Sequence, residues 1–154
     1  MNGTYGSTTA ALKKQLEVEN PDTLAVDQLV TELHKNFITV PEFVPDMLGL
    51  LSDKDERDEA SFLILKAAED LDEHVYIKKL LEFFPELIKI APEWSTLPLL
   101  RVINNQKCKK ILLSQLSLAS KSIKETVFAT CRRINDESPD FMERTRAVIA
   151  CCEV

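Results

Sequence analysis

The feature that most constrains the fold of this chain is its scarcity of glycine, which occurs only 3 times in 154 residues. An all-β protein needs many tight turns, and glycine is the residue that most readily adopts the backbone angles of those turns. The chain is instead rich in Leu, Ile, Lys, Glu and Ala, which lose little entropy on entering a helix. We therefore expect an all-α fold.

Apolar residues recur along the chain at the spacing of about 3.6 residues that marks one face of a helix. This spacing predicts nine or ten short helices joined by short links, all within a single domain that covers residues 1–154, with residues 1–6 frayed. The first predicted helix begins at a cap at Ser7 or Thr8 and ends at Asn20-Pro21. The other helices are predicted over residues 22–36, 41–51, 55–70, 72–84, 86–90, part of 91–105, 106–119, 120–134 and 139–152.

One apolar pattern occurs more than once. Residues 43–51 align with residues 76–84 at an offset of 76 − 43 = 33 residues, and a weaker third copy follows at 109–113. A period of this length is typical of proteins in which each repeat is a pair of helices stacked on the next pair. The repeat therefore predicts a HEAT-like helical stack.

Several classes of protein do not fit the sequence. No apolar run approaches the roughly 20 residues that would span a bilayer, and residues 1–10 lack the features of a signal peptide. We expect a cytoplasmic protein without membrane contact, in which all four cysteines are free thiols. Cys151 and Cys152 are adjacent, whereas zinc ligands are usually separated by two or more residues, so we expect no metal and no cofactor.

Catalytic motifs are also missing from the sequence. It contains no nucleophile elbow, phosphate-binding glycine loop or histidine-carboxylate metal motif, and its only imidazoles are His34 and His74. We expect a protein that is not an enzyme. A helical enzyme remains the alternative, and it would require a deep pocket with His34 or His74 beside carboxylates.

The distribution of charge indicates a partner surface. Residues 41–93 carry 14 acidic and 6 basic side chains, whereas residues 101–133 carry 8 basic side chains and 1 acidic one. The acidic residues cluster at 53–59 and 69–73, at successive helix ends, where they are expected to form one negative surface that attracts a basic partner. The alternative is that both clusters are solvated helix ends. The basic half lacks the interleaved aromatic residues of a nucleic-acid surface, so we expect no direct binding of nucleic acid.

The only tryptophan lies near a cluster of unusual residues. Trp94, Arg101 and Asn104 fall near one face of a helix, so the guanidinium group is expected to bind a carboxylate or helix-end carbonyls while the indole ring packs beneath it. This arrangement favours a structural role. A hot spot for partner binding is the alternative, because Trp and Arg are enriched at such sites.

These residues carry a resemblance to a known family. Tyr76 to Leu81, Leu87 to Trp94 and Leu100 to Asn104 resemble the pattern of a bacterial family, immunity protein 30, over roughly residues 33–105. The resemblance implies a small α-helical protein that accompanies polymorphic toxins, including those of contact-dependent growth inhibition. It also implies that the protein binds the toxic domain of a secreted effector and blocks its active site or its access to substrate. The motif residues are Pro92, Glu93, Trp94, Arg101 and Asn104.

Charge and resemblance together predict an antitoxin. The expected partner is the toxic domain of a larger secreted effector, a basic RNase or DNase, bound in a 1:1 complex. A helical-repeat adaptor or regulatory subunit that binds another protein is the alternative. The nine acidic residues expected to contact the toxin, which we call the acidic edge, are Asp53, Asp55, Glu56, Asp58, Glu59, Glu69, Asp70, Asp72 and Glu73.

Overall fold

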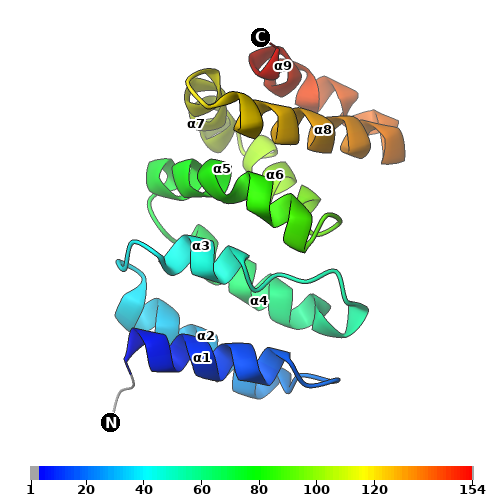
Figure 1. Ribbon diagram of the computed structural model, residues 1–154. Helices are drawn as coiled ribbons and strands as arrows, with labels where there is room; N and C mark the ends of the chain where they lie inside the picture. The colour runs from blue at the N-terminus through cyan, green and yellow to red at the C-terminus, as the bar shows by residue number, and fades with distance from the viewer. Residues whose placement is uncertain (1–3, 154) are drawn as a thin grey trace. The chain divides into compact units, whose positions relative to one another are not determined.

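The protein is helical throughout the part that the structure describes. The computed structural model describes residues 4–153, and these residues form nine α-helices and two 3-10 turns without any strand (Figure 1). The all-α prediction is therefore confirmed. The chain divides into two compact units, residues 1–71 and residues 72–154. None of the helices within residues 4–153 has the length and apolar character that crossing a bilayer requires.

The first unit contains four α-helices and one 3-10 turn. Helix α2 packs against both α1 and α4, and the short α3 packs against α4. Large side chains from all four helices, such as Leu12, Leu33, Phe43 and Ile64, have no exposed surface and form the core. The elements are α1 (Tyr5–Leu16), α2 (Thr23–Phe37), α3 (Phe43–Leu48), the 3-10 turn Asp55–Arg57 and α4 (Asp58–Glu69).

Helix α1 begins earlier than the sequence predicts. The side chain of Thr4 caps it by accepting a hydrogen bond from the backbone N–H of Ser7. The Tyr5 hydroxyl donates to Asp46 at 2.6 Å, and its ring centroid lies 5.6 Å from that of Phe37. These contacts order the first turn, so the prediction of a frayed segment is wrong for residues 4–6, whereas residues 1–3 lie outside the described residues.

Some large apolar side chains of the first unit are exposed. Leu24 is 65% exposed and Phe62 is 40% exposed, although both fall near the apolar stripe of their helices. In α4 the buried positions are Ala60, Ser61, Ile64, Leu65, Ala67 and Ala68, which lie on one side of the helix. Phe62 lies beside this face, so the apolar stripe is wider than the surface that neighbouring helices cover.

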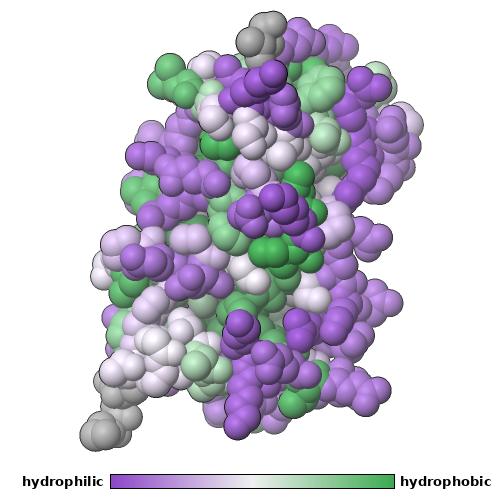
Figure 2. Space-filling view, in the orientation of Figure 1, coloured by the Kyte–Doolittle hydropathy of each residue, from purple (hydrophilic) through white to green (hydrophobic). Residues whose placement is uncertain are grey.

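The second unit contains five α-helices and one 3-10 turn. Helix α5 packs against α7 and α8, both of which pack against α9, while α6 packs against α7. Figure 2 shows that, on the face drawn, patches of hydrophobic residues lie between areas of hydrophilic residues. The elements are α5 (Glu73–Ile90), α6 (Thr96–Ile103), α7 (Gln106–Ser117), α8 (Lys121–Glu137), the 3-10 turn Pro139–Phe141 and α9 (Met142–Cys152).

Helix α5 runs through a proline at which the sequence predicts a break. The sequence predicts one helix up to Phe84 and a second one after Pro85, but residues 73–90 form a single helix of 18 residues. Pro85 has no N–H to donate to the carbonyl of the preceding turn, which costs about 3 kcal/mol in a helix interior. Phe84 and Leu87, on either side of it, are completely buried. Their burial offsets the cost of the proline and keeps the helix continuous.

Replacing Pro85 with alanine is expected to stabilise the protein by roughly 1–2 kcal/mol. The substitution restores the missing hydrogen-bond donor and a residue of high helix propensity, while the greater freedom of the unfolded chain returns part of the gain. Chemical denaturation of Pro85→Ala and of the parent chain measures the difference. A destabilised variant would show that the ring of Pro85 contributes more by packing than it costs in the helix.

The two copies of the apolar repeat have the same pattern of buried residues. Phe43, Val44, Met47, Leu48 and Leu51 are all buried, and so are the residues 33 positions later. Those equivalents are Tyr76, Ile77, Leu80, Leu81 and Phe84. The repeat therefore places the corresponding apolar residues of each unit in that unit's own core. The single-domain and HEAT-like predictions remain predictions.

Candidate partner-binding surface

Five residues of the acidic edge lie together where α4 begins. Asp55 and Glu56 are exposed in the 3-10 turn, and Asp58 and Glu59 are exposed in the first turn of α4. The partial positive charge of a helix N-terminus stabilises carboxylates at this position. Glu59 also accepts a hydrogen bond from the hydroxyl of Thr23 at 3.1 Å. The acidic loop, as we call this group, consists of Asp53, Asp55, Glu56, Asp58 and Glu59.

Glu69 and Asp70 lie at the other end of the same helix. Helix α4 has 12 residues, so its two ends are about 18 Å apart. The seven acidic-edge residues of the first unit therefore lie in two groups, one at each end of α4. Asp70 also has a partner, because its carboxylate lies 2.7 Å from Nε2 of His34 and links the end of α4 to α2.

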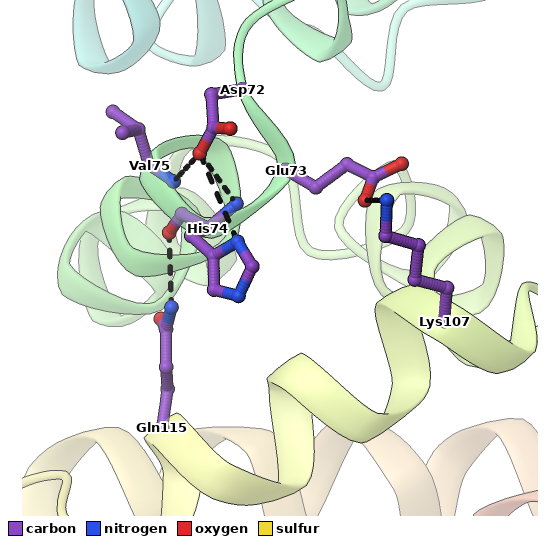
Figure 3. Close-up of polar contacts among 6 residues, drawn as sticks. All are labelled: Asp72, Glu73, His74, Val75, Lys107 and Gln115. Carbon is purple, nitrogen blue, oxygen red and sulfur yellow. Dashed lines mark hydrogen bonds and ion pairs between the residues drawn. The ribbon is translucent and has the colours of Figure 1, made fainter.

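Asp72 and Glu73 belong to the second unit, where both are used by the fold (Figure 3). Asp72 is the N-cap of α5 and accepts hydrogen bonds from the backbone N–H groups of His74 at 3.1 Å and Val75 at 3.3 Å. Glu73 lies 3.0 Å from the ammonium group of Lys107 on α7. This hydrogen bond raises the pKa of Lys107 above its ordinary value. Both carboxylates thus stabilise the start of α5.

Two substitutions at Asp72 separate its role as a cap from its charge. Asp72→Ala is expected to lower the free energy of unfolding by about 1 kcal/mol, because two N–H groups of α5 lose their acceptor. Asp72→Asn is expected to have little effect, since an asparagine side chain caps a helix as well as aspartate does. Thermal unfolding of both variants measures these effects. Equal losses would show that the negative charge matters more than the hydrogen bonds.

The motif residues between Pro92 and Asn104 are tied to later helices of the second unit. The carbonyl oxygen of Pro92 accepts hydrogen bonds from the hydroxyl of Ser95 at 2.7 Å and from the guanidinium group of Arg133 on α8. The side-chain oxygen of Asn104 accepts from Arg144 on α9 at 3.1 Å. No local pattern in the sequence singles out the two arginines, because they lie about 40 residues away from the groups they bind.

The other motif residues are in the same region of the fold. Trp94 is partly buried before α6, whereas Glu93 and the α6 residue Arg101 are exposed. The hydrogen bonds of Pro92 and Asn104 are contacts within the second unit, and they support the structural role expected for this segment. The segment lies inside that unit, since the division between the units falls at Leu71 and Asp72.

Each histidine lies beside a carboxylate, as the enzyme alternative requires. His34 pairs with Asp70 in the first unit, and in the second unit Nδ1 of His74 lies 3.9 Å from Asp72. His74 lines an open groove, but its side chain is 68% exposed. The two imidazoles belong to different units, so they do not combine within either one.

The cysteines form neither a disulfide nor, within the described part of the chain, part of a metal site. Within residues 4–153, no three His, Cys, Asp or Glu side chains are arranged to hold a metal ion. All four cysteines are free thiols. Burial raises the pKa of Cys131 to about 12 and that of Cys152 to about 11, so both thiols remain protonated and unreactive at neutral pH.

Comparison with known proteins gives one match. A family model described as immunity protein 30 matches residues 10–112. No curated protein and no solved structure matches the chain. The matched range contains the whole acidic edge and all the motif residues, and it ends within α7. It also contains residues 33–105, over which the sequence resembles this family, so the resemblance is confirmed.

Proposed function

Since the chain belongs to the immunity protein 30 family, we propose that it binds the toxic domain of a cognate effector and neutralises it. We assign the toxin-binding surface to the acidic loop because of the charge of this loop. It places five acidic and two basic side chains within seven residues, at the exposed start of α4. A surface of this sign attracts a basic protein and speeds its association.

The proposed partner is a nuclease domain. Nucleases bind a polyanion, so their substrate-binding surfaces carry positive charge. A protein that covers such a surface with carboxylates prevents the nucleic acid from reaching the active site. Within the acidic edge we assign the main contact to the acidic loop, because the loop holds five of the nine residues within seven positions. Asp70, Asp72 and Glu73 lie in smaller groups at the end of α4 and the start of α5. Glu69 and these three residues are proposed to contribute at the margin.

The proposed mechanism is stoichiometric binding in the cytoplasm, without a chemical step. The protein and the toxin domain form a 1:1 complex, and protection lasts as long as the complex does. Inhibition should therefore be complete when one equivalent of the protein has been added. A catalytic antitoxin would instead inactivate many equivalents of toxin.

The experiment that tests this proposal uses the toxin domain encoded directly upstream of this chain's gene. The two proteins are co-expressed, the complex is purified, and nuclease activity is titrated with the full chain. We expect co-purification, cell survival and an end point at one equivalent. An unrelated toxin domain serves as the control and should be neither bound nor inhibited. The proposal is wrong if the upstream toxin remains active with excess protein present, and co-purification of a different protein would favour the adaptor alternative.

A further inference from the structure

The second unit has an open groove with an unusually exposed leucine at its side. The groove has a volume of about 380 Å³ and lies between α5, the end of α7 and the start of α8. Its apolar wall includes Leu81, Leu118 and Ile123, and Leu118 is 89% exposed, more than any other large hydrophobic residue in the described part of the chain. An exposed apolar side chain next to an apolar hollow is typical of a protein interface.

One polar atom at this groove has no hydrogen-bond partner among the described residues. The side-chain nitrogen of Gln115 donates to the carbonyl oxygen of His74 at 2.9 Å, which joins α7 to the first turn of α5 (Figure 3). The side-chain oxygen of Gln115 is buried, and no group within residues 4–153 donates a hydrogen bond to it. Buried polar atoms in folded proteins are usually satisfied. Gln115 thus has one acceptor at the wall of the groove that no described residue satisfies.

The charges along the groove are arranged so that two copies of this surface can attract each other. Lys78 and Glu82 both line it, both are exposed, and they lie one turn apart on α5. A twofold axis that crosses the exposed face of α5 between them would place the α5 helices of two copies antiparallel. Each Lys78 would then lie opposite Glu82 of the other copy. A uniformly basic or acidic partner would instead meet one like charge.

We propose that this face forms a homodimer in which Leu118 of each copy fills the groove of the other. Two Lys78–Glu82 ion pairs form across the twofold axis. Because the groove is small, the interface lies near the lower end for specific complexes, at roughly 1,200 Å² in total, and dimerisation depends on concentration. The proposal does not depend on the identity of a toxin.

The first test measures the mass of the full chain by sedimentation velocity from micromolar to millimolar concentration. The parent chain is expected to convert from monomer to dimer over this range. Leu118→Asp should remain a monomer, because it places a charge in the apolar groove. Leu24→Asp is the matched control, since Leu24 is 65% exposed in the first unit and should leave dimerisation unchanged. A parent chain that stays monomeric at every concentration overturns the proposal.

The second test asks whether Lys78 and Glu82 meet across two copies. Lys78→Glu alone and Glu82→Lys alone should each impair dimerisation, because each brings like charges together twice. An equimolar mixture of the two variants should recover it, because both pairs become attractive in the mixed dimer. No change within a single copy produces this recovery. A mixture that associates no better than its components rules out the antiparallel contact.

Discussion

Reversing Asp55, Glu56, Asp58 and Glu59 to lysine is expected to slow association with a basic toxin domain by roughly 10- to 1,000-fold at low salt. The four carboxylates are exposed at the start of α4 and supply most of the charge of the acidic loop. The effect should shrink as salt is added, since ions screen the attraction that the parent chain uses. Stopped-flow measurement of the association rate at several salt concentrations provides the comparison.

The control for this prediction changes net charge equally at another place. Asp136, Glu137, Asp140 and Glu143 are exposed in the second unit, and their reversal adds the same positive charge. It should slow association far less if the acidic loop makes the contact. Equal slowing by both variants would assign the effect to net charge and contradict the proposed surface. Thermal unfolding must accompany both, because acidic residues in the first turn of α4 also stabilise the helix by about 0.3–1 kcal/mol each.

Truncating Phe84 is expected to remove a large part of the protein's stability. Phe84 has no exposed surface and lies beside Pro85, where α5 depends on packing to continue. Phe84→Ala removes that packing and leaves a cavity, which costs about 3–5 kcal/mol. The total stability of a natural domain is only about 5–15 kcal/mol, so the loss is a substantial fraction of it. Urea denaturation followed by circular dichroism measures the loss.

Phe62 provides a control of the same residue type. Its side chain is 40% exposed, and the ammonium group of Lys66 lies 5.7 Å from its ring centroid. Phe62→Ala should cost well under half as much as Phe84→Ala, because much of the removed surface is already in contact with water. Comparable losses at the two positions would mean that exposure does not describe how tightly Phe62 is packed.

The sequence predicts helices well because the signals that form them are local. The sequence predicts a helix over residues 22–36, and Asp22 caps it by accepting a hydrogen bond from the backbone N–H of Leu24. The repeat at an offset of 33 residues identifies positions that are buried in both copies. Caps and apolar spacing act over three or four residues, so the linear sequence contains the information needed to recognise them. Apolar spacing does not reveal that Phe62 is 40% exposed, because exposure depends on which neighbouring helices cover a face.

The candidate sites required the tertiary structure. The sequence shows that acidic residues are concentrated at 53–59 and 69–73, but only the structure shows that the length of α4 separates the acidic loop from Glu69 and Asp70. Helix α5 continues through Pro85 because its neighbours are buried, which local propensity does not indicate. The bonds of Arg133 and Arg144 and the groove beside Leu118 join residues about 40 positions apart. Thus the sequence alone determined the helical class and the family, whereas packing between distant helices decided which side chains are available to a partner.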